Sequence, residues 1–164
     1  SILKASQAYS SGNYVECAKH LLKVDKGSLP STTAKNLYTS MKDKAFQNAA
    51  TQLSNSGDAS YKAYKYQDAL DDYEQSYKYN KSYNTQYQIA RCYMFLNKNT
   101  DKATKYFYDI INNSGDSDLI RKAANYGLGM TVNSAKEAAA KAKGGSTTTD
   151  SKSDTASSSD SSTS

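Results

Sequence analysis

Cys17 and His20 are the residues whose types and spacing come nearest to catalytic chemistry. Three positions apart on a helix, their side chains share one face and could form a thiolate–imidazole pair that attacks an electrophile. Such a nucleophile also needs a group that orients the histidine and donors that stabilise an oxyanion, and no neighbouring motif provides either. The chain also lacks a glycine-rich phosphate loop and the GxSxG and HExxH patterns. We therefore predict that the protein has no catalytic residues and is not an enzyme.

The same pair could supply two ligands to a zinc ion, but zinc usually takes four, commonly from paired motifs. No second motif is present, and Glu16 lies on another helix face. We therefore predict no metal site and no cofactor. A disulfide between Cys17 and Cys92 is allowed by the cysteine count alone. We expect instead two small buried thiols, because the repeat described below places these residues in separate helix pairs.

The distribution of charge bears on the kind of partner. The whole chain has a formal net charge of +5, and residues 144–164 contribute −2 from three aspartates and one lysine, which leaves +7 on residues 1–143. A basic balance favours acidic partners. The lysines are spread along the chain and mostly alternate with acidic residues, and no zinc-finger or helix-turn-helix pattern occurs. We predict a protein or peptide partner of acidic character and no nucleic acid.

Apolar residues recur three and four positions apart through most of the chain, which is the period of an amphipathic helix. No segment alternates long enough to indicate a strand, and no run approaches the about 18 consecutive apolar residues of a membrane-spanning helix. From Gly144 onward, small and polar residues dominate, a composition that does not form a packed core. We predict an all-α domain at 1–143 and a disordered tail or linker at 144–164.

An internal repeat with a period of 34 residues is the strongest pattern in the sequence. This period separates Ala69 from Ala103 and Tyr73 from Phe107. In both copies a small residue in a first helix is followed by a polar turn, and then by a small residue and a large aromatic in a second helix. A weaker copy opens the chain, with Cys17 at the small position. Each helix pair leaves an apolar face for the next, so several pairs must stack before any is stable.

The period and the order of small and aromatic residues resemble the tetratricopeptide repeat (TPR) family, in particular a bacterial TPR-like helical repeat domain. The resemblance covers most of residues 1–130 and is clearest in 57–111. It implies an α–α solenoid of three to four antiparallel helix pairs whose first helices line a concave face. The sequence departs from the family because its first helices carry no Trp, and because Lys81 stands where a proline would close the second repeat. A capping helix is predicted at 134–143.

One spacing predicts an unusually long helix. Cys17 and Ala69 are 52 residues apart, which is 18 more than one period of 34. Eighteen residues are about five helical turns, so an insertion of that length keeps the apolar face in phase. We predict a single helix over 32–64 with Ser31 as its N-cap. A separate short helix at 32–46 is the alternative.

The fifteen tyrosines exceed what the packing between helices requires. Several fit packing positions, namely Tyr14, Tyr66, Tyr73, Tyr93 and Tyr106. We expect that some of the others are exposed, since exposed tyrosine beside lysine suits recognition of peptides or glycans. This second group comprises Tyr61, Tyr64, Tyr77, Tyr79, Tyr83 and Tyr87. The TPR resemblance implies that a ligand contacts the first helices, where the candidate binding residues are Tyr61, Lys62, Lys65, Tyr87, Arg91, Met94, Arg121, Lys122 and Asn125.

Together these features favour a non-catalytic protein–protein interaction scaffold that binds a peptide or protein on the concave face. The Ser/Thr/Asp-rich segment resembles the flexible spacers of Gram-positive surface proteins. We therefore expect part of a larger, extracytoplasmic bacterial envelope protein, with any membrane anchor outside this sequence; a cytoplasmic location stays open. Two alternatives are an accessory domain that binds anionic cell-wall polymer and one that supports an enzyme domain elsewhere in the parent chain.

Overall fold

The computed structural model describes residues 1–144, and this part of the chain is built from helices without any strand. The prediction of an all-α fold is confirmed. The α-helices are α1 (Ile2–Ser10), α2 (Tyr14–Leu22), α3 (Thr32–Lys62), α4 (Tyr66–Tyr79), α5 (Tyr83–Leu96), α6 (Thr100–Asn113), α7 (Ser117–Lys122) and α8 (Val132–Lys143). A short 3-10 helix, η1 (Lys26–Ser28), precedes α3, and a π-helical segment, η2 (Ala123–Leu128), continues α7. The predicted disorder of the segment after Gly144 lies outside the described residues.

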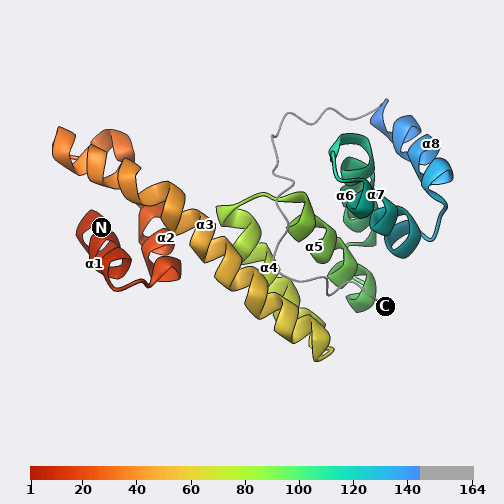
Figure 1. The fold of residues 1–164 in the computed structure, drawn as a ribbon, viewed down its shortest axis with the longest axis horizontal. Coiled ribbons are helices and arrows are strands. Elements are labelled where there is room, and N and C mark those ends of the chain that lie inside the picture. Colours follow the sequence, from red (N-terminus) through yellow and green to blue (C-terminus); the bar gives the residue numbers. More distant parts are fainter. Residues whose placement is uncertain (145–164) are drawn as a thin grey trace.

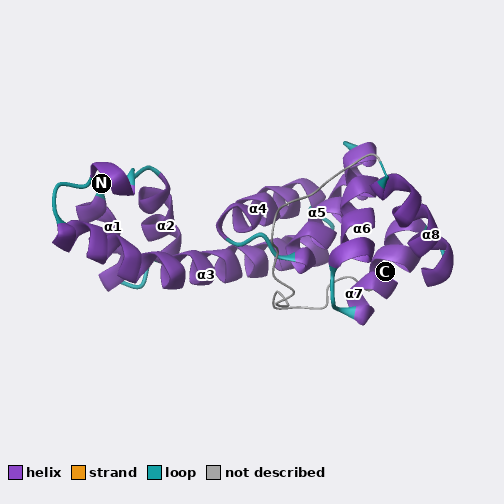
Figure 2. Ribbon diagram, turned by 90° about the horizontal axis from the view of Figure 1, so that it is seen from above, coloured by secondary structure: helices purple, strands orange, loops and turns teal. Residues whose placement is uncertain are grey.

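Helices that follow one another in the chain pack side by side, and the whole is elongated (Figures 1 and 2). The pairs α1–α2, α3–α4 and α5–α6 each pack closely, and α8 packs against α6 and η2. The first pair lies on the N-terminal half of α3, while α4 lies along its C-terminal half (Figure 1). The long helix therefore joins the N-terminal pair to the rest of the molecule. None of the helices formed by the described residues has the length and apolar character needed to cross a membrane.

The predicted long helix is present as a single element, which excludes the alternative of a separate helix at 32–46. α3 runs without a break through the segment around Gly57, and the Oγ of Ser31 accepts a hydrogen bond from the Ala34 N–H at 3.1 Å, as expected of its N-cap. Its buried residues Met41, Ala45 and Ala49 recur four positions apart, so the apolar face stays in phase across the insertion.

Close approach of α3 and α4 depends on a glycine. A Cβ at Gly57 would lie 2.7 Å from the ring of Tyr73, which is fully buried and donates a hydrogen bond to the Asp58 carboxylate at 2.5 Å. Farther along the same contact, the Ser76 hydroxyl donates to the carbonyl of Ala50 at 2.7 Å. Gly127 of η2 similarly leaves room for the ring of Phe107. The small residues of the sequence pattern thus lie where helices or rings meet.

The first helices of three pairs end with the same backbone motif. α1, α3 and α5 are each followed by a residue in the left-handed region: Gly12 (φ 77°), Tyr64 (φ 63°) and Asn97 (φ 52°). In each case the next N–H donates to the carbonyl five residues earlier, from Asn13 to Ala8, Lys65 to Ser60 and Lys98 to Tyr93. This is the Schellman motif, in which glycine and asparagine are the usual left-handed residues. Gly129 (φ 65°) ends η2 in a related, wider turn.

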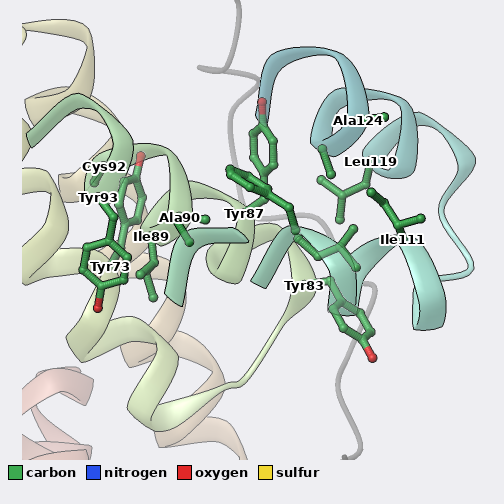
Figure 3. Packing of buried hydrophobic residues seen from close by; sticks show 14 of the residues in the cluster. Tyr73, Tyr83, Tyr87, Ile89, Ala90, Cys92, Tyr93, Ile111, Leu119 and Ala124 are labelled. Atoms are coloured by element: carbon green, nitrogen blue, oxygen red, sulfur yellow. The ribbon is translucent and has the colours of Figure 1, made fainter. Parts of the chain in front are cut away.

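The core consists of three clusters. The largest fills the C-terminal helices, and Figure 3 shows Tyr73, Ile89, Cys92 and Tyr93 grouped together within it. A second, smaller cluster joins α1, α2 and the start of α3, and a third lies where α2, α3 and the end of α4 meet. The residues predicted to occupy the small position of each copy, Cys17, Ala69 and Ala103, are fully buried. Both cysteines are free and lie in different clusters, which confirms that they are small buried thiols.

Candidate functional site

A continuous series of ring and guanidinium contacts crosses the end of α3, the turn after it, the start of α4, the second half of α5, the end of α7 and η2. We call these residues the aromatic–arginine surface. Its members are Tyr61, Tyr64, Tyr66, Arg91, Phe95, Arg121 and Tyr126. They come from three successive helix pairs, so this surface depends on how the pairs stack and not on any single helix.

Stacked aromatic rings form one end of the surface. Tyr66, the first residue of α4, stacks on Phe95 of α5 with ring centroids 4.4 Å apart and an interplanar angle of 6°. Tyr61, in the last turn of α3, contacts both rings edge-on at 5.4 and 5.9 Å. Tyr64 in the turn between α3 and α4 contacts Tyr66 edge-on at 6.5 Å. Stacked and edge-on pairs are the preferred geometries of aromatic rings, so these four positions support one another.

Arg91 connects the rings to η2. Because Arg91 and Phe95 are four residues apart on α5, the guanidinium lies over the ring, 4.8 Å from its centroid. Its Nη1 donates to the backbone carbonyl of Tyr126 at 2.7 Å. Arg91 has no carboxylate partner among the described residues, and its buried Nε likewise has no hydrogen-bond partner there. A half-buried guanidinium without a carboxylate favours an anionic ligand nearby.

The π-helical segment supplies the other end of the surface. In a π-helix the hydrogen bonds run between residues five apart, which brings such residues to one side. The guanidinium of Arg121, near the end of α7, lies 5.9 Å from the ring centroid of Tyr126 in η2, five positions later. Asp118 binds Arg121 at 2.8 Å and Lys122 at 3.5 Å, and the hydrogen bond from Arg121 is the main cause that lowers the pKa of Asp118. Asp118 therefore holds Arg121 in place while the Tyr126 ring stays exposed.

The surface is open to solvent. Of the large apolar side chains that are most exposed in residues 1–144, three belong to it: Tyr64 (80%), Phe95 (46%) and Tyr126 (43%). Met94, beside Phe95 in the sequence, is similarly exposed. By contrast Tyr61, which contacts Tyr66 and Phe95, is buried, and burial raises its pKa even though Arg91 nearby lowers it in part. Exposed rings on a buried aromatic base form a preorganised contact surface.

The structure brings together three of the nine predicted binding residues, Tyr61, Arg91 and Arg121. Four others are exposed and lie next to members of the surface in the sequence: Lys62, Lys65, Met94 and Asn125. Lys122 is half-buried in its ion pair with Asp118. Tyr87 lies in the core, where its ring packs edge-on against Phe107 at 6.0 Å, so a ligand cannot reach it in this structure (Figure 3).

The expectation about exposed tyrosines holds for Tyr64 and needs correction for most of its group. Tyr79, Tyr83 and Tyr87 are buried, and Tyr77 is half-buried, where it donates a hydrogen bond to Gln86. These side chains are buried because stacked pairs cover two faces of an inner helix, whereas the sequence argument counted only one stripe. Among the packing tyrosines, Tyr73 and Tyr93 are buried as predicted, and Tyr14, Tyr66 and Tyr106 are half-buried.

The nine predicted binding residues did not include Phe95, Tyr126 or Tyr64, although Tyr64 belonged to the tyrosines among which exposed ones were expected. The four-residue spacing between Arg91 and Phe95 could have predicted their contact, since it puts both side chains on one helix face. Tyr126 had no such signal, because a spacing of five from Arg121 puts two residues on one side only in a π-helical turn.

The residues first considered for chemistry lie far from this surface in the sequence, on α2. His20 Nε2 is 3.8 Å from Glu16 Oε2, so the expectation that Glu16 lies on another helix face is wrong with respect to His20. Cys17 is fully buried, and burial raises the pKa of its thiol. Burial also raises the pKa of Cys92, to about 12, so neither thiol is activated as a thiolate. Across residues 1–144 no three His, Cys, Asp or Glu side chains lie close enough together to hold a metal ion.

The fold and its surface define an all-α protein of successively packed helix pairs with an aromatic–arginine face. We found no match to this chain among protein-family models, curated proteins or solved structures.

Proposed function

We propose that this chain is a non-catalytic interaction scaffold that binds an acidic peptide or protein segment on the aromatic–arginine surface. The observation that carries the proposal is the continuous contact series from Tyr64 to Tyr126, which keeps three large rings exposed around an arginine that has no carboxylate partner among the described residues. Aromatic residues and arginine are the types most enriched at the energetic centres of protein interfaces.

Charge supports an acidic ligand. Lys62 and Lys65 are exposed beside the rings and form no ion pair with any described residue. Together with Arg91 on α5, which has no carboxylate partner among the described residues, they provide three cations on the elements that form the surface. Complementary charge would speed association and orient the ligand, while the rings would supply apolar contact area.

The placement of the surface also agrees with the resemblance to TPR domains. Tyr61, Arg91 and Arg121 come from α3, α5 and α7, which are the first helices of successive pairs. In a TPR-like solenoid these helices would line the concave face. A scaffold of this kind within a larger extracytoplasmic bacterial protein remains our proposal for its setting.

A second candidate, binding of an anionic cell-wall polymer, is favoured by the net charge of +7 on residues 1–143, given by the whole-chain +5 minus the −2 of the remaining segment. A polymer without apolar groups would be held by charge alone, so its affinity would fall steeply with added salt. The aromatic rings would then contribute little to binding.

The test uses selection from a displayed library of random twelve-residue peptides, followed by affinity measurements with the enriched peptides. We expect enriched sequences that combine Asp or Glu with a large apolar residue. Phe95→Ala should weaken their binding about tenfold, because a central aromatic anchor is lost. Leu22→Ala is the matched control, since Leu22 on α2 has the same 46% exposure and lies outside the surface.

Polyphosphate serves as the competing probe. If no peptide is enriched, or if Phe95→Ala and Leu22→Ala bind the enriched peptides equally well, the proposal is wrong. If polyphosphate binds with an affinity that Phe95→Ala leaves unchanged and no acidic–apolar peptide is enriched, the polymer-binding alternative takes its place.

A further inference from the structure

Tyr64 occupies a backbone conformation that tyrosine rarely adopts. At the end of each first helix the chain needs a left-handed residue, and three of the four positions hold Gly12, Asn97 and Gly129. Glycine has no Cβ to clash in this region, and asparagine tolerates it. Tyr64, with φ 63°, is the exception among the described residues. A bulky side chain in this region is strained, and the strain persists only if the surrounding structure or a function maintains it.

The Tyr64 side chain makes few contacts within the molecule that could offset this strain. It is 80% exposed, the highest value among the large apolar residues of the described chain, and its one ring contact is with Tyr66 at 6.5 Å. The hydrogen bonds that end α3, from Tyr64 N–H to the Tyr61 carbonyl and from Lys65 N–H to the Ser60 carbonyl, use only backbone atoms. The same two backbone hydrogen bonds would form with less strain if asparagine or glycine stood at position 64. Packing therefore does not account for a tyrosine at this position.

The surroundings of Tyr64 indicate what its ring would contact. The ring contacts Tyr66, which is half-buried and stacks on the exposed Phe95, so a side chain lying against Tyr64 would also lie close to this stacked pair. The turn segment 61–66 carries two exposed cations, Lys62 and Lys65, and no acidic residue; Asp68 is the nearest acid along the chain. A ligand segment with a large apolar residue next to a carboxylate matches this arrangement in shape and charge.

We infer that Tyr64 is a ligand-contact residue, kept in a strained turn to present its ring to an apolar side chain of an acidic peptide. The inference rests on the proposed function and adds the residue that selects the apolar part of the ligand. On this account Tyr64 lowers the stability of the free protein and raises its affinity for the ligand.

A reciprocal pair of substitutions tests whether Tyr64 strains the left-handed turn. Tyr64→Asn should raise the melting temperature by about 2–4 °C, since asparagine fits the left-handed turn. Asn97→Tyr makes the opposite exchange at the equivalent turn and should lower the melting temperature by a similar amount. If Tyr64→Asn instead melts at or below the wild-type temperature, the strain on which the inference rests is absent and the inference is overturned.

The binding part uses peptides enriched by wild-type protein from the displayed twelve-residue library. Tyr64→Asn should bind them about tenfold more weakly, whereas Tyr64→Phe, which keeps the ring, should bind within about twofold of wild type. Unchanged binding by Tyr64→Asn, with Phe95→Ala still impaired, would overturn the role of Tyr64 while the proposed function stands. A failure of wild-type protein to enrich acidic–apolar peptides would remove both.

Discussion

At the scale of single residues, the fold is most sensitive where a glycine meets a buried ring. Gly57 of α3 is such a position, because a Cβ there would lie 2.7 Å from Tyr73, well inside van der Waals contact. The ring cannot easily retreat, since it is fully buried and its hydroxyl is bonded to Asp58. Overpacking of this kind forces side chains or backbone to shift.

Gly57→Ala should therefore lower the free energy of unfolding by about 1–3 kcal/mol. Gly27→Ala is the control, because Gly27 lies in η1, its nearest neighbouring atom would be 3.5 Å from an added Cβ, and its φ is not in the left-handed region. Urea denaturation of the two variants measures the difference. Equal stabilities would mean that α3 and α4 are farther apart in solution than the structure has them.

Residue patterns predicted the buried positions better than the exposed ones. Cys17, Ala69 and Ala103 were identified as small core residues because the 34-residue period and the helix-packing argument both depend on them. The candidate binding residues were harder to predict, since exposure depends on which faces neighbouring pairs cover. Tyr87 and Tyr64 look alike in the sequence, yet one is 2% exposed and the other 80%.

At the scale of elements, the length of α3 could be predicted because helical phase is a local property. The 18 additional residues complete about five turns, so the buried stripe through Met41, Ala45 and Ala49 continues into the segment that packs against α4. The start of α3 also followed from local chemistry, with Ser31 as the N-cap before the first turn. The helix ends at Lys62, two residues before the predicted end, because the chain turns through a left-handed residue at Tyr64.

The N-cap of α3 gives a direct test at this scale. Ser31→Ala removes the acceptor of the Ala34 N–H and should lower the free energy of unfolding by about 1 kcal/mol. Ser40→Ala, in the interior of the same helix and equally on the exposed side, should be neutral or slightly stabilising, because alanine has the higher helix propensity. If both variants unfold like wild type, the first turn of α3 is not part of the cooperative structure.

The π-helical segment η2 could not be predicted in the same way. Its wide turn directs the Tyr126 carbonyl to Arg91, which lies 35 residues earlier in the chain. A contact over that distance leaves no periodic trace in the sequence around 123–128. Sequence reasoning named Tyr61, Arg91 and Arg121 of the aromatic–arginine surface as separate residues, but it could not predict the contact of Arg91 with Tyr126 on which the surface depends.

At the scale of the whole molecule, the described residues form an elongated series of helix pairs in which α3 joins the N-terminal pair to the C-terminal core (Figure 1). The pairing of neighbouring helices followed from the repeat. The arrangement that unites residues of α3, α4, α5, α7 and η2 on one surface is a property of the stacked pairs, so the proposed binding would depend on the intact domain. The central claim is therefore about the location of binding on the folded protein.

The most direct test of that claim is a titration of isotope-labelled protein with a selected acidic–apolar peptide, followed by amide chemical shifts in NMR spectra. We predict that the largest shifts fall within 61–66, 91–95 and 121–126, with little change in α1 and α2. Shifts confined to α1 and α2, or spread evenly over all lysine-bearing helices, would contradict binding at the aromatic–arginine surface.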